Sequence, residues 1–310
     1  MARSSSILYG SSWILVVYTL LIIAWGAWVR ISGSGAGCGD HWPLCHGTAV
    51  PLGAEWRTWI EVSHRYSTAL FGILVIAQIA FIRTLMPSGH PARRWVWLTL
   101  LLTISEALIG RFLVKQGLVN ESQSIYRLVV MPLHLLNTSL LLCAEVATAE
   151  SLRSGLCNSS TIYSHSNIYS HSKRRTLHIY ALAIAVIALL ISGAIAALGS
   201  HLMPSQSLLD GLQHDLSLDA HPAVRLRVLH PLLGLLIPMG LWLFITFSAN
   251  DTSTPQAVAA RKHLLWALAI TVLIGISTLG LLSPTWLKLL HLTAANLLVI
   301  LAARYGYHSL

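Results

Sequence analysis

Long apolar runs separated by short polar stretches dominate the chain. A helix needs roughly 20 apolar residues to cross a bilayer. Eight runs reach that length, at about 12–32, 60–85, 95–115, 127–147, 177–199, 226–248, 264–282 and 286–304. Inside hydrocarbon the backbone of such a run satisfies its own hydrogen bonds only as a helix. The pattern therefore predicts an all-α integral membrane protein with eight transmembrane helices.

The second half of this pattern repeats the first. Three pairs of segments match: WGAWVRISGSG (25–35) with ISGAIAALGSH (191–201), ALIGRFLV (107–114) with VLIGISTLGLL (272–282), and LHLLNTSLLL (133–142) with LHLTAANLLVI (290–300). We therefore expect two pseudo-repeated four-helix bundles, one in residues 1–149 and one in residues 177–310. Residues 150–176 are rich in Ser and His and poor in apolar residues, which predicts a flexible cytoplasmic linker.

Composition and charge place the chain in its membrane. The chain is 55% hydrophobic and 10% charged, whereas a soluble domain is about 25% charged. On the N-terminal side, the loops and span ends carry Arg3, Arg83, Arg93, Arg94, Arg153, Lys173, Arg174, Arg175, Arg261, Lys262 and Arg304, and the acidic residues gather on the other side. The positive-inside rule then predicts both termini in the cytoplasm. The net charge of +9 indicates contact with anionic membrane lipid rather than nucleic acid. The first run shows no signal-peptide cleavage site, so we expect a retained span in a bacterial inner membrane.

Four histidines lie near the external ends of the second and fourth spans of each half: His64, His134, His230 and His291. An ionisable residue within a span is a functional hypothesis by default. Imidazole is a usual ligand of heme iron, and two facing helices can each supply one. The matched pairs therefore favour two heme-iron sites over a proton relay or structural packing. Zinc is disfavoured because neither half adds further ligands at metal spacing.

Glu61 precedes His64 by three residues, in EVSHR (61–65), so a helix places both on one face. The carboxylate could transfer protons or stabilise a developing cation; alternatively it is a helix-entry carboxylate. The matching position in RVLHP (227–231) is Arg227. This asymmetry predicts one reactive site and one supporting site.

Five arginines border the external ends of the spans: Arg30, Arg65, Arg127, Arg225 and Arg227. Arginine pairs well with carboxylates, so we expect them to bind heme propionates, with interfacial snorkelling as the alternative for each. Glu106 and Arg111, in the third span, could form a pair, or Glu106 could deliver protons.

Two cysteines, Cys38 and Cys45, share the first external loop. An oxidising compartment and a separation of six intervening residues favour a disulfide. Two free thiols or a metal site are the alternatives.

Together these residues resemble the heme A synthase family. VRISGSGAGCGDHWPLCHG (29–47) is similar to that family's first external loop, and EVSHR (61–65) is similar to its Glu-x-x-His-Arg motif. The remaining histidines fall where the family places its own. Two features depart from the pattern: GSHLMPSQSLLDG (199–211) lacks a second cysteine pair, and His230 is followed by Pro231 instead of arginine.

The resemblance implies an oxidoreductase that oxidises a ring methyl of heme O to a formyl group, through a hydroxymethyl stage. It implies that Glu61, His64 and His134 serve the substrate heme, and that His230 and His291 hold a heme b that relays electrons. It also implies heme O synthase and terminal-oxidase assembly factors as partners, together with an electron donor that the sequence does not name.

Two other classes of protein compete with this interpretation. A non-enzymatic di-heme b electron-transfer protein explains the histidines equally well, but gives no reason for a glutamate in one half only. A transporter built on parallel repeats predicts broken spans and no heme.

Overall fold

The regular structure of the protein is helical, as the apolar pattern predicts. The computed structural model describes residues 2–119, 122–154, 168–247 and 254–309. Within them, eight segments are long and apolar enough to cross a membrane. The helices are α1 (Ala2–Ile31), α2 (Trp56–Leu85), α3 (Ala92–Lys115), α4 (Arg127–Ser154), α5 (Ile168–Leu202), α6 (Leu208–Leu216), α7 (Pro222–Leu226), α8 (Leu229–Phe247), α9 (Pro255–Gly280) and α10 (Thr285–Ser309). The prediction of an all-α multi-pass membrane protein is confirmed.

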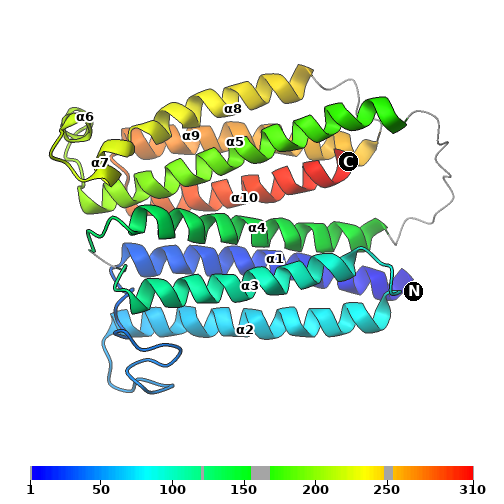
Figure 1. The fold of residues 1–310 in the computed structure, drawn as a ribbon, viewed down its shortest axis with the longest axis horizontal. Helices are drawn as coiled ribbons and strands as arrows, with labels where there is room; N and C mark the ends of the chain where they lie inside the picture. Colours follow the sequence, from blue (N-terminus) through cyan, green and yellow to red (C-terminus); the bar gives the residue numbers. More distant parts are fainter. Residues whose placement is uncertain (1, 120–121, 155–167, 248–253, 310) are drawn as a thin grey trace.

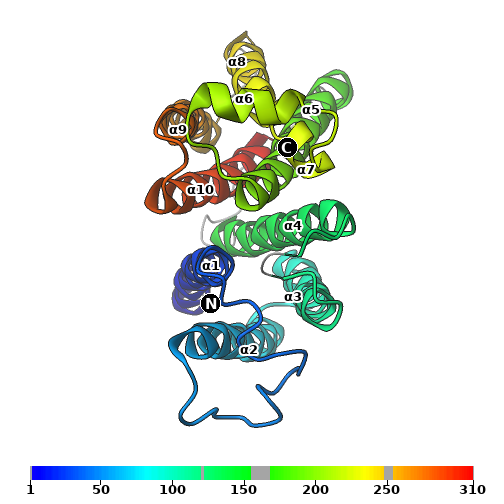
Figure 2. The same ribbon diagram turned by 90° about the vertical axis from the view of Figure 1, so that its left-hand side faces the viewer.

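The long helices form two groups of four. Helices α1 to α4 make the first group, and α5, α8, α9 and α10 make the second (Figure 2). Helix α4 packs against α5 and α10, and α1 also contacts α10, so these helices join the groups. Both termini lie at the same end of the molecule (Figure 1), as an even number of crossings requires.

Apolar side chains form a separate core in each group and a third core between them. The core of the first group includes Leu15, Val75 and Val96, and that of the second includes Leu241, Leu264 and Leu298. The third core draws on both groups, with Val16, Leu142, Val146, Leu190, Val299 and Ile300. The two groups therefore pack as one body.

A division precedes the sixth span: α7 ends at Leu226 and α8 begins at Leu229, so the helix predicted at 226–248 corresponds to α8. Pro231 explains the division. Its ring cannot donate a hydrogen bond and clashes with the carbonyl four residues earlier, which belongs to Arg227. The chain turns there, with the His230 amide donating to the Arg227 carbonyl at 3.2 Å.

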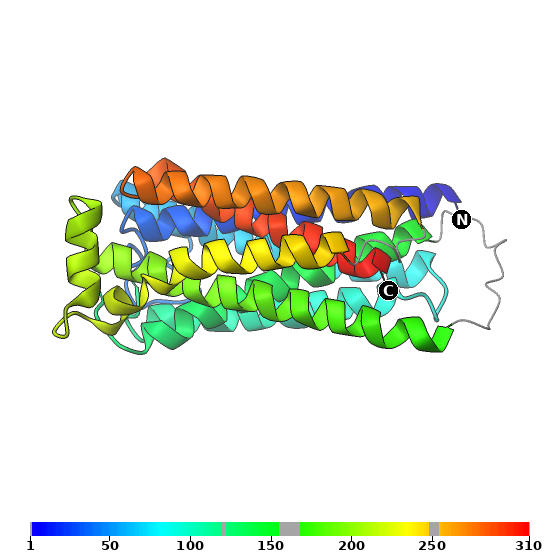
Figure 3. The ribbon, with the colours of Figure 1, turned by 90° about the horizontal axis from the view of Figure 1, so that it is seen from above.

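A short helix at the end opposite the two termini (Figure 1) was not anticipated. Helix α6 lies across the ends of the second group (Figures 2 and 3). The Ser207 side chain caps it by accepting a hydrogen bond from the amide of Asp210 at 3.1 Å. A serine followed three residues later by an acidic residue is a helix-start signal, so the sequence contained the information.

The predicted linker at 150–176 is partly helical. Helix α4 continues to Ser154 and α5 begins at Ile168. The middle of the predicted linker, 155–167, lies outside the described residues, so its flexibility stays a prediction.

Candidate functional site

The four histidines gather toward one end of the molecule. Each lies near the start of its helix: His64 in α2, His134 in α4, His230 in α8 and His291 in α10. These helix starts lie at the end opposite the two termini (Figure 1). Each group of helices therefore holds one histidine pair, as the repeat predicts.

The second pair is compact. The ring centroids of His230 and His291 lie 6.1 Å apart. Each ring packs against a glycine of the preceding long helix. A β-carbon on Gly193 of α5 would stand 3.1 Å from His230 Cε1, and one on Gly275 of α9 would stand 3.0 Å from His291 Cε1. Ser192 Oγ shares a hydrogen bond with His230 Nδ1 at 3.0 Å. The glycines let the rings lie close to the neighbouring backbone, and the serine fixes one ring by its Nδ1 atom.

The first pair repeats this packing at only one of its histidines. A β-carbon on Gly26 of α1 would stand 2.9 Å from His64 Cε1, but one on Gly110 of α3, the counterpart of Gly275, would meet no atom within 4 Å. His134 instead faces a carboxylate, with its Nδ1 3.2 Å from Glu106 Oε1. The sequence repeats contained these glycines, but nothing in them indicated a role beside histidine.

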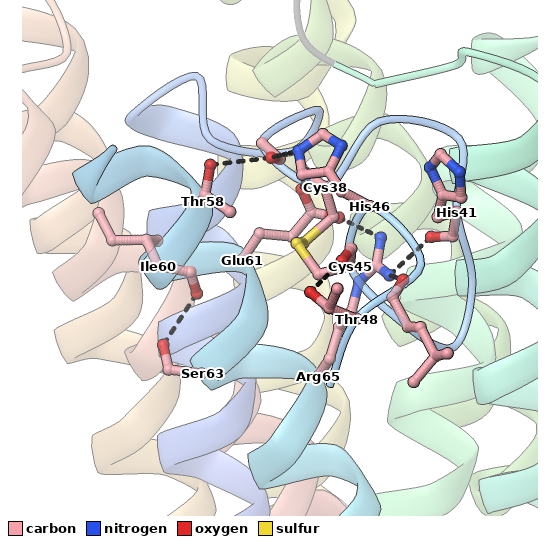
Figure 4. Close-up of a disulfide and its surroundings, with 12 residues drawn as sticks. Cys38, His41, Cys45, His46, Thr48, Thr58, Ile60, Glu61, Ser63 and Arg65 are labelled. Atoms are coloured by element: carbon pink, nitrogen blue, oxygen red, sulfur yellow. Dashed lines mark hydrogen bonds and ion pairs between the residues drawn. A yellow bond between two sulfur atoms is a disulfide. The ribbon is translucent and has the colours of Figure 1, made fainter. Parts of the chain in front are cut away.

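Glu61 joins α2 to the first external loop, as Figure 4 shows. Its side chain is buried, with 3% of the residue exposed. The Cys38 amide donates to Glu61 Oε2 at 2.9 Å, and Arg65 Nη2 donates to Oε1 at 2.5 Å. Because α2 begins at Trp56, Glu61 lies beyond the first turn, and the helix-entry interpretation does not hold.

The first external loop is closed by the Cys38–Cys45 disulfide, which confirms that prediction. Arg65 Nη1 donates to the carbonyls of His41 at 2.7 Å and Leu44 at 2.9 Å. Arg65 therefore binds the loop as well as Glu61, and its guanidinium is already engaged by protein groups.

Arg227 likewise anchors the loop between α5 and α8, which carries α6. It donates to the Met203 carbonyl at 2.6 Å and to Ser205 Oγ at 3.0 Å, and it pairs with the carboxylate of Asp215. Only 8% of Arg227 is exposed. This arginine ties the start of the sixth span to the loop that carries α6.

The other three arginines make no carboxylate pair within the described parts of the chain. Arg127 is 1% exposed and its Nε has no hydrogen-bond partner among the described residues, although Nη1 donates to the Ser122 carbonyl at 2.5 Å. Arg30, in the last turn of α1, interacts electrostatically with Arg127 and Lys288. Arg225 is exposed at the end of α7. Lys288 belongs to no motif, so nothing in the sequence marked it as part of this group.

The expected pair between Glu106 and Arg111 does not form. Glu106 turns to α4, where it contacts His134, and the Arg111 guanidinium carbon lies 5.8 Å from the centre of the Trp42 ring. A spacing of five residues places the two side chains on different faces of the helix, which explains the difference.

The fold and the paired histidines define a class: a multi-pass helical membrane protein with one histidine pair in each of two four-helix groups. The family model described as cytochrome oxidase assembly protein (COX15-CtaA) matches residues 11–303, and the chain belongs to this family.

Curated proteins with similar sequences carry two different names. A protein of Thermus thermophilus named protoheme IX farnesyltransferase is 33% identical over 296 residues, which is 93% of this chain and 46% of that protein. The heme A synthase of Symbiobacterium thermophilum is 36% identical over 91 residues, 29% of each chain. The heme A synthase of Exiguobacterium sibiricum is 31% identical over 96 residues, 31% of this chain and 32% of that one. The chain thus spans about half the length of the first of these relatives.

Proposed function

We propose that this protein is a heme A synthase, a membrane oxidoreductase that converts a ring methyl group of heme O to a formyl group. One observation carries the proposal: a buried glutamate lies one helical turn before a histidine of the first pair, and its counterpart before the second pair is an arginine. Family membership and the similarity to heme A synthases support the same conclusion.

His230 and His291 would hold a heme b. The two ring centroids lie 6.1 Å apart, so both imidazoles would be near enough to bind one iron. The Ser192 contact at Nδ1 would leave Nε2 of His230 for the metal, because a metal-binding histidine uses its other ring nitrogen for a hydrogen bond. Heme b supplies one-electron transfer when bound.

His64 and His134 would bind the iron of the substrate, heme O, with Glu61 as the catalytic group. A carboxylate in this position can accept or return a proton, or stabilise positive charge that develops on the oxidised carbon. Arg227 supports this role indirectly. A loop anchor three residues before the histidine need not be acidic, so anchoring alone does not explain a glutamate.

Heme propionates require cationic partners, and the external arginines would supply them. Arg30, Arg127 and Arg225 are the best placed, because they make no ion pair with a described carboxylate. Arg65 and Arg227 are occupied by the loops, so they would reach a propionate only by exchanging a loop contact for it. A carboxylate that replaces those contacts would couple heme binding to the conformation of the loop.

The protein would lie in a bacterial inner membrane with both termini in the cytoplasm, on the distribution of basic residues. Its substrate would come from a heme O synthase. The Thermus relative supports this partner, because it is named for farnesyl transfer to protoheme IX and only 46% of its length matches this chain. Terminal-oxidase assembly factors and an electron donor would complete the setting.

Coexpression with a heme O source tests the proposal. Hemes extracted from membranes that contain the wild-type chain should include heme A, identified by mass. His64→Ala and His134→Ala should abolish it, and His90→Ala, at the other end of the bundle between α2 and α3, should not. Heme b without heme A in the wild-type membranes would establish the di-heme electron carrier instead.

A further inference from the structure

A polar network between α3 and α4 surrounds one histidine only. Glu106 Oε1 accepts a hydrogen bond from Thr138 Oγ1, and Oε2 accepts one from Asn137 Nδ2 at 2.5 Å. Ser105 Oγ donates to Asn137 Oδ1, also at 2.5 Å. The carboxylate is therefore held in place from α4, and it stands 3.2 Å from Nδ1 of His134.

The described residues of the second half make a smaller contact at this place, in which Thr271 Oγ1 donates to the Ala294 carbonyl at 3.5 Å. Alignment of Gly110 with Gly275 places Thr271 opposite Glu106, and alignment of His134 with His291 places Ala294 and Ala295 opposite Asn137 and Thr138. The carboxylate is thus replaced by a hydroxyl, and the amide and hydroxyl of α4 are replaced by methyl groups. The network is a property of the first half, and loop anchoring does not explain it because it lies within the helices.

We propose that Glu106 is a positioning residue for His134: it holds the imidazole through Nδ1 and directs Nε2 to the iron. This inference rests on the proposed function, which assigns His134 to the substrate heme. In the structure the two atoms are at ion-pair distance but not in hydrogen-bond geometry, so the ring would have to rotate to form the hydrogen bond, while α4 holds the carboxylate in place. A carboxylate partner on a metal-bound histidine fixes the tautomer and raises the basicity of the ligand.

The consequence is a difference between the two iron sites. His134 becomes a strongly electron-donating ligand, whereas His230 has a neutral serine at the same ring atom. The stronger electron donor, His134, would thus serve the heme that is oxidised, and His230 with its neutral serine would serve the heme that relays electrons. This difference agrees with one reactive and one supporting heme.

The iron–histidine stretching vibration tests the proposal without any turnover. In full-length protein with His64→Ala, loaded with hemin and reduced, His134 is the single protein ligand of the first site, and resonance Raman spectra should show its stretching band. Adding Glu106→Gln should move that band to lower frequency. Glu55→Gln, which removes an exposed carboxylate at the same end of the molecule, should leave it in place.

Two further variants keep the test decisive. In the His134→Ala background, where His64 is the ligand, Glu106→Gln should not move the band. If Glu106→Gln lowers protein yield, the pair Asn137→Ala and Thr138→Ala, which copies the second half, should give a smaller shift in the same direction. An unshifted band in the Glu106 variant would overturn the positioning role and leave His134 as a ligand. Absence of the band in the His64→Ala parent would overturn the His134 assignment itself, and heme A yield then reports separately on the reaction.

Discussion

Glu61 and Arg227 occupy matching positions, three residues before a histidine, and carry opposite charges. Both are buried, at 3% and 8% exposure. Glu61 accepts from the first external loop through the Cys38 amide, and Arg227 donates to the second through the Met203 carbonyl and three other groups. The same position relative to the histidine therefore anchors the neighbouring loop in both halves, with donor and acceptor exchanged.

The difference shows how a repeat can diverge around a site without changing its fold. The first loop is also held by a disulfide and by the contacts of Arg65, so Glu61 is one of several links between this loop and α2. The second loop lacks cysteines, and Arg227 makes most of its connections to the helix. Only the first arrangement leaves an acidic group beside a histidine pair, and this is where we place the reaction.

The largest expected effect is that of Glu61→Gln. The amide oxygen of glutamine still accepts from Cys38, so the loop stays anchored, but the ionisable group is lost. Heme A yield should fall at least about tenfold, which corresponds to about 1.4 kcal/mol of barrier. Heme O or its hydroxymethyl derivative should accumulate, as mass analysis of extracted heme would show.

The control for this substitution is Glu55→Gln, which removes an exposed carboxylate just before α2. It should leave the yield unchanged. A normal yield of heme A in the Glu61 variant, at equal protein level, would reduce Glu61 to a loop anchor like Arg227.

A somewhat smaller effect is expected where the two halves differ in glycine packing. Gly275→Ala should displace the His291 ring, since the new carbon would lie 3.0 Å from Cε1, and purified protein should lose much of its b-type heme absorbance. His291→Ala and His230→Ala set the limit of complete loss at this site. Gly110→Ala, at the matching position of the first half, has open space and should retain heme; equal losses in the two glycine variants would remove the packing argument.

The sequence predicted the spans, because the length and hydropathy of an apolar run follow from the thickness of the bilayer. It predicted both histidine pairs because they lie at matching positions of the repeat. It also predicted the disulfide, from the compartment and from the spacing of the two cysteines. It did not predict that Arg65 and Arg227 would be taken by the loops, because loop paths depend on the tertiary contacts of single residues. The glycine contacts were missed for a related reason: a glycine in an apolar helix has several explanations, and only the neighbouring helix selects one.

Glu106 shows the same limit more sharply. Its sequence neighbourhood suggested a partner five residues away in α3, whereas its three partners lie in α4, about thirty residues along the chain. A helix presents a polar side chain to whichever neighbour faces it, and that neighbour is fixed by packing between helices.

The smallest expected effect is that of removing the disulfide. This change tests whether the loop between α1 and α2 and the loop between α5 and α8 stay anchored without it. Cys38→Ser together with Cys45→Ser removes the disulfide. Because the loop that it closes is short, the loss of stability should be less than the about 3 kcal/mol expected for a 15-residue loop. Arg65 and Glu61 still hold the loop through their own hydrogen bonds. External protease should therefore cut near 38–48 faster than in the wild type, while b-type heme in the second half and the thermal stability of the bundle stay nearly unchanged.

Arg227→Gln provides the comparison, because it removes a buried charge and the principal anchor of its loop, so cleavage at 203–221 should increase more. If the cysteine variant loses the second-half heme as well, the loop is a structural part of the whole bundle, and the two halves are not anchored separately.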